Sequence, residues 1–272
     1  MVGRTANVAL GALLLACPPA TGCAAPDASV VTFNIENYPR SERQAHAALA
    51  LVGSTGAPVV GLQEIRDPEH LRQAAQAQLG ASWRFVTHEA RGRSLRVGLL
   101  YDGSRVALEH AIAHDAVRVT PGGRPALEVL LLEPGGQRLR VFVVHLKAGA
   151  GYDDVRKRQM EALSAIVAAA RAGSGAGERL VVLGDFNVIG ALGELQMRHL
   201  ARTTGLIWSS EHVPYTAMHH RDGRCAVSSL DHILSSEPLR AAPLGPCTAQ
   251  PPGDRCPVFV DQVSDHCPVA GH

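Results

Sequence analysis

Acidic, amide and imidazole side chains follow short apolar runs of the sequence. Residues 30–33 (VVTF) lead into Asn34, and residues 59–62 (VVGL) lead through one further residue into Glu64. Polar groups at the ends of neighbouring strands converge at one edge of a sheet, where binding and catalytic sites are common. The residues with chemical potential in this pattern are Asn34, Glu36, Glu64, His145, Asp185, Asn187, Asp231, Asp265 and His266.

Part of this set consists of oxygen donors. Hard divalent cations such as Mg²⁺ take oxygen ligands, usually with only one or two protein carboxylates. Glu64, Asp265, Asn34 and Glu36 offer such oxygens. The sequence therefore predicts a site for Mg²⁺ or Mn²⁺.

The other residues suit the attack of water on a phosphate ester. Asp185, beside Asn187, can act on a water molecule, and His145 and His266 can donate hydrogen bonds to an anionic oxygen. Asp231 can hold one imidazole in its useful tautomer. Such a combination favours phosphoester hydrolysis, in which positioning and charge stabilisation dominate. The motifs G-x-S-x-G and G-x-x-x-x-G-K-S/T do not occur, so acyl transfer and nucleotide hydrolysis by those routes lose support.

The apolar runs are expected to be buried strands, because each spans four to six residues between turn residues. Helices are expected over 41–52, over 68–79 with Asp67 as N-cap and Gly80 as stop, and over 153–170. Residues 134–137 predict a hairpin turn. One mixed α/β domain over 26–272 follows. Its expected strands are 30–33, 59–62, 97–100, 127–132, 139–144, 180–183 and 230–234.

Composition excludes some classes of protein. Of the 272 residues, 46% are hydrophobic and 19% are charged, which provides enough apolar material for a core and excludes wholesale disorder. No apolar run reaches the roughly 18 residues that a membrane-spanning helix needs. The 26 basic and 25 acidic residues nearly balance, which argues against binding of nucleic acid by bulk charge alone.

The first 25 residues resemble an export signal. Arg4 precedes a short apolar stretch over residues 8–16, which is typical of a signal-peptide core. Cleavage near Ala24 or Ala25 is one interpretation. The alternative is a lipoprotein signal, in which Cys17 is the lipidated residue of a lipobox. Either interpretation predicts a protein that is secreted, periplasmic or anchored at the cell envelope.

Four cysteines remain after the signal region, and an even number in an exported chain predicts disulfides. Three pairings are possible. We favour one bond that closes the proline-rich loop over 241–257, Cys247–Cys256, and a second bond between Cys225 and Cys267. Four free thiols are the alternative, and no C-x-x-C spacing supports a zinc site.

Seven motifs in order are similar to the endonuclease/exonuclease/phosphatase superfamily, which has the DNase I-like fold. They span residues 30–269, nearly the whole mature chain, and read FNIEN, GLQE, GLLYD, VVHLKAG, LGDFN, LDHI and SDHCPV. The resemblance implies an α/β fold of two packed mixed β-sheets flanked by helices, a four-layer sandwich. It also implies hydrolysis of phosphoric esters that depends on Mg²⁺ or Mn²⁺.

Catalytic roles follow from the resemblance by position. Asp185 would orient or deprotonate the attacking water, and Asn187 would contact the phosphate. His266 would pair with Asp231, and His145 would bind the scissile phosphate or serve as an acid. The metal would be held mainly by Glu64, with three further residues in or near its shell, namely Asn34, Glu36 and Asp265.

One departure concerns the partner of His145. DNase I pairs the equivalent histidine with a glutamate shortly before the strand that contains Leu99, and here residues 94–96 read Ser-Leu-Arg. This difference favours a mechanism with the single dyad Asp231–His266. Three residues are candidates for binding the substrate, although each could also be structural or solvated: Lys147, Tyr101 and Arg156.

The activity we expect is that of an exported, monomeric nuclease acting on DNA, RNA or both. The alternative within the fold is a phospholipid or sugar-phosphate phosphoesterase, similar to sphingomyelinases or inositol phosphatases. Long apolar insertion hairpins would favour a phospholipid substrate, and the sequence shows none. A binding protein without catalysis is disfavoured, since the chain retains Glu64, Asp185 and His266.

Overall fold

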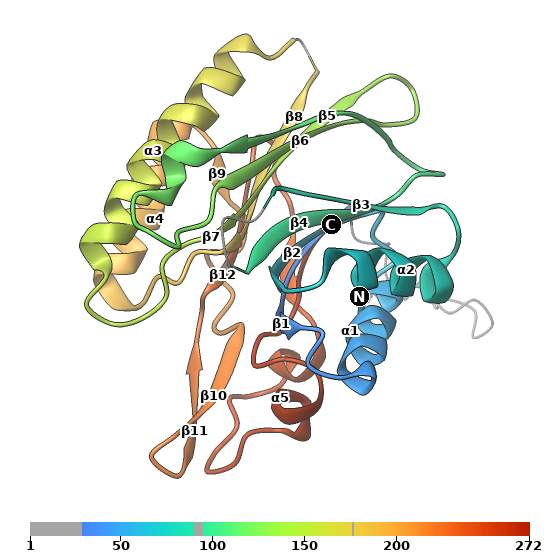
Figure 1. Cartoon of the computed structure of the whole chain (residues 1–272). Coiled ribbons are helices and arrows are strands. Elements are labelled where there is room, and N and C mark those ends of the chain that lie inside the picture. Colours follow the sequence, from blue (N-terminus) through green and yellow to red (C-terminus); the bar gives the residue numbers. More distant parts are fainter. Residues whose placement is uncertain (1–28, 90–94, 176) are drawn as a thin grey trace, which may run out of the picture.

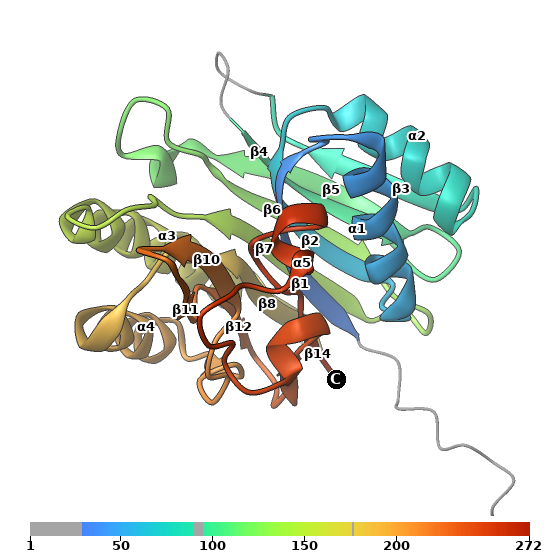
Figure 2. The ribbon, with the colours of Figure 1, turned by 90° about the horizontal axis from the view of Figure 1, so that it is seen from below.

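Two six-stranded β-sheets pack face to face, and helices cover their outer faces (Figures 1 and 2). This computed structural model describes residues 29–89, 95–175 and 177–272; the export signal and Cys17 lie outside this part. The first sheet has the order β13 (Ala241–Pro243), β14 (Val269–Gly271), β1 (Val30–Tyr38), β2 (Val59–Ile65), β4 (Arg96–Asp102), β3 (Trp83–Thr87). The second has the order β5 (Ala107–His114), β6 (Ala126–Leu132), β7 (Arg138–His145), β8 (Arg179–Asp185), β12 (Asp231–Ser235), β9 (Ile207–Trp208).

Strand direction decides which residues reach the same edge of the sandwich. β1 and β2 run parallel, as do β7 and β8, and β12 runs antiparallel to β8. The ends of β7 and β8 and the start of β12 therefore meet, with His145 opposite Asp185 and Asp185 opposite Asp231. This register explains why polar residues that follow separate apolar runs belong to one site.

The core between the sheets consists of aliphatic side chains. Val59, Leu99, Val141 and Leu183 are buried in it. The two sheets approach each other closely at Gly61, where a Cβ atom would lie 2.1 Å from Leu183 Cδ1. A larger residue there would push the sheets apart, which would also displace the catalytic ends of the strands.

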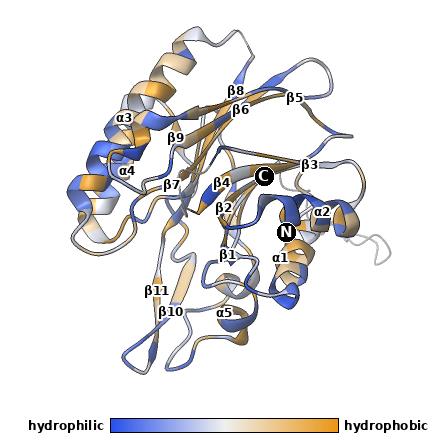
Figure 3. Cartoon of the chain, viewed as in Figure 1, coloured by the Kyte–Doolittle hydropathy of each residue, from blue (hydrophilic) through white to orange (hydrophobic). Residues whose placement is uncertain are grey.

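Helices form the two outer layers. α1 (Glu42–Ser54) and α2 (Pro68–Leu79) cover the first sheet, and α3 (Asp153–Gly173) and α4 (Gly190–Thr204) cover the second (Figure 2). Each of the four buries an apolar stripe, and their outer faces are mainly hydrophilic, except that α4 exposes Leu192 and Leu195 (Figure 3). Among the described residues no helix is long and apolar enough to cross a membrane.

A two-stranded hairpin, β10 (Ala217–Arg221) and β11 (Arg224–Ser228), extends below the sheets in Figure 1. It lies beside the segment that contains the short helix α5 (Val258–Gln262). Single 3₁₀ turns occur at Asp115–Arg118 and Gly245–Thr248. The root of the hairpin reaches the catalytic edge, because Ala217 forms a β-bridge with His266.

The predicted fold class is confirmed, and each expected strand lies within an observed one, except that the strand expected over 230–234 begins one residue later, at Asp231. Asp67 caps α2 by accepting a hydrogen bond from His70 N, and Gly80 ends the helix as expected. Besides α5 and the short strands β3, β9, β10, β11, β13 and β14, the sequence analysis missed α4, which begins at Gly190 after an N-cap, Ile189, without a side-chain hydrogen bond, and β5, an edge strand that is largely exposed. Both lack the local signals on which the other elements were recognised.

The expected disulfide pairing is wrong. Cys225 bonds to Cys256, and Cys247 bonds to Cys267, with Cα–Cα distances of 4.8 Å and 6.2 Å. The reason is the hairpin, which carries Cys225 out to the proline-rich loop, where its amide donates to Gly253 O. Cys267 is held instead at the root of the hairpin, where its amide donates to Thr216 O, within reach of Cys247.

Candidate active site

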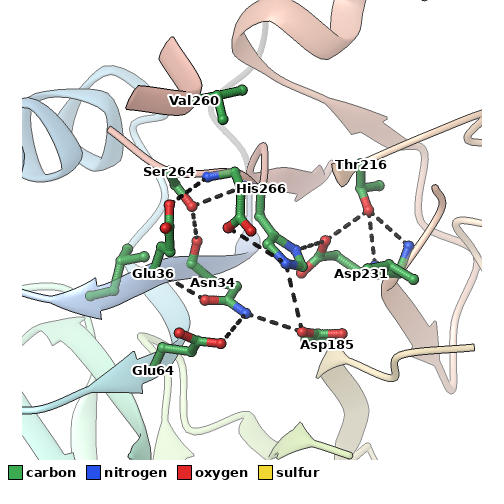
Figure 4. Close-up of polar contacts among 12 residues, drawn as sticks. Asn34, Glu36, Glu64, Asp185, Thr216, Asp231, Val260, Ser264 and His266 are labelled. Atoms are coloured by element: carbon green, nitrogen blue, oxygen red, sulfur yellow. Dashed lines mark hydrogen bonds and ion pairs between the residues drawn. The ribbon is translucent and has the colours of Figure 1, made fainter. Parts of the chain in front are cut away.

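Two sheets meet at the site through the side chain of Asn34. Its Nδ2 donates to Asp185 Oδ2 at 3.0 Å and to Glu64 Oε1 at 3.4 Å (Figure 4). Asn34 is fully buried on β1, whereas Asp185 ends β8 in the opposite sheet. One amide group therefore fixes the distance between two carboxylates that come from different sheets.

Asp185 lies at the centre of the buried cluster. Burial and the charge of Asp231 raise its pKa, while His266, Asn34 and the amide of Asn187 lower it, and the net result is a pKa of about 7. The amide of Asn187 donates to Asp185 Oδ1 at 2.9 Å. A carboxylate with a pKa near neutrality can accept a proton from water and release it again.

His266 and Asp231 form a hydrogen-bonded pair, with 2.7 Å between Nδ1 and Oδ2. Burial opposes the charged imidazole, but Asp231, Asp185 and Asp265 raise the pKa of His266 well above its ordinary value. Thr216 Oγ1 donates to the same Asp231 oxygen at 2.7 Å. The pair leaves Nε2 of His266 pointing toward Asp185, at 3.8 Å from its Oδ2 (Figure 4).

His145 approaches Asp185 from the end of β7. Its Nε2 lies 3.4 Å from Asp185 Oδ2 and 3.9 Å from Glu64 Oε1. Burial, together with the positive charges of Arg124 and His266, holds its pKa well below the ordinary value, so the ring is neutral. Its Nδ1 has no hydrogen-bond partner in the described part of the chain, so no second histidine–carboxylate dyad is seen there.

Acidic side chains gather on the β1–β2 side of the site. Glu64 Oε2 accepts from the amide of Asn37 at 3.1 Å, and Glu36 Oε2 accepts from the amide of Asp265 at 2.9 Å. Burial raises the pKa of Glu36, and the negative charges of Asp265 and Glu64 raise it as well, against a pair with Arg40. These carboxylates therefore repel one another.

The backbone is strained around the same residues. In the described part of the chain, six residues other than glycine have positive φ, and four of them belong to the site: Glu36, Asn37, Glu64 and Asn187, with φ of 43°, 53°, 63° and 53°. Asparagine tolerates such conformations, but they are unfavourable for glutamate, so at Glu36 and Glu64 they persist because the surrounding structure imposes them. The strand pairing is irregular at the same places, between Asn34 and Tyr38 in β1 and between Leu62 and Ile65 in β2.

The donor set suits a hard divalent cation. The described residues do not form a ready cage of three or more His, Cys, Asp or Glu side chains. Mg²⁺ does not require one, because it keeps several waters and uses one or two carboxylates. A cation would relieve the repulsion among Glu36, Glu64 and Asp265. The side-chain oxygen of Asn34 accepts from the Glu36 amide, so it could bind the cation only if this hydrogen bond were broken.

Arg124 is a residue of the site that the sequence analysis missed. It precedes β6, and the charges of Glu64 and Asp185 act on it, although burial lowers its pKa. Its Nε is buried without a hydrogen-bond partner among the residues described. The only sequence signal was a cation just before a strand that neighbours β7, which is too common to be specific.

The three residues expected to bind substrate have different positions. Lys147 follows His145, and its Nζ lies 4.4 Å over the ring of Tyr152, at the open edge. Arg156 is only 1% exposed and donates to the carbonyls of Lys147 and Gly149, so it shapes this loop from inside. Tyr101 pairs with Val59, at the end of β2 opposite to Glu64, because β4 runs antiparallel to β2. Neither Arg156 nor Tyr101 faces the site.

The comparisons with known proteins agree with this geometry. The model of the endonuclease/exonuclease/phosphatase family matches residues 31–266. The chain belongs to this family. A search of curated proteins finds no match.

Solved structures share the fold of this family member at low sequence identity. D. rerio TDP2, solved with a single-stranded DNA product, has a TM-score of 0.67 and 16% identity over 89% of this chain and 96% of its own. The catalytic domain of human nocturnin, solved with a sulfate anion, has a TM-score of 0.61 and 19% identity over 89% and 94%. ANGEL2, described as a 2′,3′-cyclic phosphatase, has a TM-score of 0.67 and 16% identity over 90% and 94%.

Removal of the Cys247–Cys267 bond should reduce activity as well as stability, because Cys267 directly follows His266. We expect the double variant Cys247→Ser/Cys267→Ser to lose about 2–4 kcal/mol of unfolding free energy. Its kcat should fall about tenfold or more as His266 loses its anchor. Chemical denaturation and phosphoesterase assays measure the two effects.

The matched control is Cys225→Ser/Cys256→Ser, which frees the hairpin from the proline-rich loop but leaves the chain around His266 fixed. It should lose similar stability with a smaller loss of kcat. Equal activity losses in both double variants would contradict a specific role of the Cys247–Cys267 bond in holding His266.

Proposed function

We propose that the chain is a divalent-metal-dependent phosphodiesterase that hydrolyses DNA, RNA or both by in-line attack of an activated water. The observation that supports this most strongly is the cluster around Asp185, in which the Nε2 atoms of two histidines approach one carboxylate oxygen at 3.4 Å and 3.8 Å. A phosphate bound beside these groups would meet a proton acceptor and imidazole donors at once.

Each member of the cluster has a distinct task in this proposal. Asp185, whose pKa is about 7, accepts the proton of the attacking water. His266, kept protonated by Asp231, donates a hydrogen bond to a phosphate oxygen on which negative charge increases. His145 is neutral and would donate a hydrogen bond to the same phosphate, and Asn187 would contact the phosphate.

Mg²⁺ or Mn²⁺ would be held mainly by Glu64, with Glu36, Asp265 and Asn34 around it. When bound, the cation would polarise the phosphoryl oxygen and neutralise negative charge. Arg124 adds a fixed positive charge on the same side as Glu64 and Asp185, which favours an anionic substrate. Lys147 can contact a neighbouring phosphate from the rim.

We further propose that the protein acts outside the cytoplasm as a monomer. Two disulfides in the described residues are consistent with an oxidising compartment. D. rerio TDP2, which has the same fold, was solved with single-stranded DNA, and this supports nucleic acid as the substrate class without identifying it for this chain.

Purified protein should cleave plasmid DNA, single-stranded DNA or RNA in Mg²⁺ or Mn²⁺ and lose this activity in EDTA. Glu64→Gln removes the carboxylate charge at similar size and should lower the rate at least about 10²-fold. Excess metal should partly restore its rate. Gel assays with each substrate provide the measurement.

The control is Glu69→Gln, an exposed glutamate on α2 that should retain the wild-type rate. Intact nucleic acid under all conditions would contradict the nuclease proposal. A phosphate-release screen with phospholipids and sugar phosphates would then test the other substrates expected for this fold.

A further inference from the structure

The hydroxyl of Thr216 makes three hydrogen bonds, all of them to the start of β12 (Figure 4). Thr216 directly precedes β10 and is fully buried. Its Oγ1 lies 3.0 Å from the amide nitrogens of Leu230 and Asp231 and 2.7 Å from Asp231 Oδ2. Both amides can only donate, so they occupy the two lone pairs of the hydroxyl oxygen. The single hydroxyl proton is therefore directed to Asp231 Oδ2.

The carboxylate of Asp231 is held by one of its two oxygens. Oδ2 accepts from Thr216 Oγ1 and from His266 Nδ1, both at 2.7 Å. Oδ1 is buried without a hydrogen-bond partner among the residues described. Rotation about the Cβ–Cγ bond of an aspartate is only weakly restricted, so neighbouring donors decide its orientation. Without the hydroxyl, His266 alone would hold the carboxylate that is meant to orient it.

The backbone of Thr216 contacts the segment that carries the other member of the pair. Its carbonyl oxygen accepts from the amide of Cys267 at 2.6 Å. The next residue, Ala217, forms a β-bridge with His266. Thr216 therefore contacts Asp231 through its side chain and the His266 segment through its backbone. One residue at the root of the hairpin connects both partners of the dyad.

The orientation of the His266 ring decides where its second nitrogen donates. Nδ1 is bound to Asp231, and Nε2 lies 3.8 Å from Asp185 Oδ2. The imidazole is rigid, so a rotation of the Asp231 carboxylate that displaces Nδ1 also displaces Nε2. A misplacement of about 1 Å in a catalytic group can cost about 10²-fold in rate. The position of the carboxylate oxygen therefore matters for the hydrogen bond from Nε2.

We propose that Thr216 is a positioning residue that acts on His266 through Asp231. Its hydroxyl fixes the carboxylate oxygen that accepts from Nδ1, and this fixes the direction in which Nε2 donates to the phosphate. The expected effect on rate rests on the proposed function, whereas the hydrogen bonds exist in the free protein. Three residues, rather than two, then orient the donor to the phosphate.

The hydrogen bond between His266 and Asp231 can be observed without metal, substrate or turnover. Protein labelled with ¹⁵N-histidine, in EDTA, should show a low-field Nδ1 proton resonance that is absent in His266→Gln. Thr216→Val keeps the shape of the side chain and removes the hydroxyl, so it should shift this resonance upfield or broaden it. Thr216→Ser should retain it. An unchanged resonance in Thr216→Val, or none in the wild-type protein, would overturn the proposal.

Hydrolysis of an activated phosphodiester provides the second readout. Thr216→Val should lower kcat about tenfold with KM within about twofold, because a misdirected donor stabilises the transition state less without affecting substrate binding. Thr216→Ser should recover kcat to within about threefold of the wild type. In the His266→Gln background, Thr216→Val should not lower kcat further. A further tenfold loss there, or a wild-type kcat in Thr216→Val, would contradict action through His266.

Thr204→Val is the matched control. Thr204 is 3% exposed, and its Oγ1 donates to Leu200 O at 2.7 Å within α4. This variant also removes a buried hydroxyl, but at a distance from the dyad. It should lower the unfolding temperature, as Thr216→Val does, and keep both the low-field resonance and kcat. Equal losses of kcat in the two valine variants would show a general effect of stability and overturn the proposal.

The two readouts separate this inference from the proposed function. A protein that shows the expected resonance changes but hydrolyses neither nucleic acid nor the activated phosphodiester would contradict the proposed function alone. An active enzyme in which Thr216→Val alters neither the resonance nor kcat would contradict the inference alone.

Discussion

Asp185→Asn should reduce kcat by about 10³-fold and leave the fold intact. Asparagine matches aspartate in size but cannot accept the proton of the attacking water, and general base catalysis contributes about 10²–10⁴-fold. Asp185 uses both oxygens as acceptors, from Asn34 Nδ2 and from the Asn187 amide, so the variant keeps only one of these two bonds. Loss of a buried carboxylate near Asp231 offsets part of that cost, because burial and Asp231 both oppose the charge.

The measurement is steady-state hydrolysis of an activated phosphodiester beside nucleic acid, with thermal unfolding as the check on structure. Asp261→Asn is the control, since Asp261 is exposed and its carboxylate lies outside the site, 3.6 Å from His220 Nε2. A wild-type kcat in Asp185→Asn would remove Asp185 from the role of base. A loss of rate that follows a loss of unfolding temperature would show a structural role.

Local patterns in the sequence are sufficient to predict the elements that carry the chemistry. The strands are short apolar runs with polar residues at their ends, and the register His145–Asp185–Asp231 brings these ends together. Such signals lie within a few residues of each other, which makes them visible without a structure. The nine predicted residues accordingly lie at one edge of the sandwich, while their individual roles stay predictions.

Features that depend on the path of the chain through space were not predictable. Tyr101 ends an apolar run as Glu64 does, but its strand runs in the opposite direction and carries it to the far end of the sheet. Arg156 is charged, yet three oxygen acceptors around it compensate its burial. The disulfides depend on a hairpin whose length decides which cysteines meet. Local sequence patterns do not determine the direction of a strand, the acceptors that surround a buried charge or the distance that a hairpin spans.

A double-mutant cycle on Asp231 and His266 should show that the two residues act as one unit. His266→Gln removes the imidazole that donates to the phosphate, and we expect kcat to fall about 10³-fold. Asp231→Asn removes the charge that keeps His266 protonated and should lower kcat about 10²-fold. The double variant should be no slower than His266→Gln alone, because Asp231 is proposed to act only through His266.

The unfolding free energies of these variants should rank differently from their kcat values, so the two measurements distinguish an effect on catalysis from an effect on folding. His266→Gln leaves Asp231 buried without its cationic partner, although Thr216 still donates to it, so we expect a loss of about 3–5 kcal/mol of unfolding free energy. Asp231→Asn in the His266→Gln background removes that uncompensated charge and should restore part of the stability without restoring kcat. Additive losses of kcat would contradict the dyad, since two residues that contribute independently to catalysis would each keep their full effect in the absence of the other.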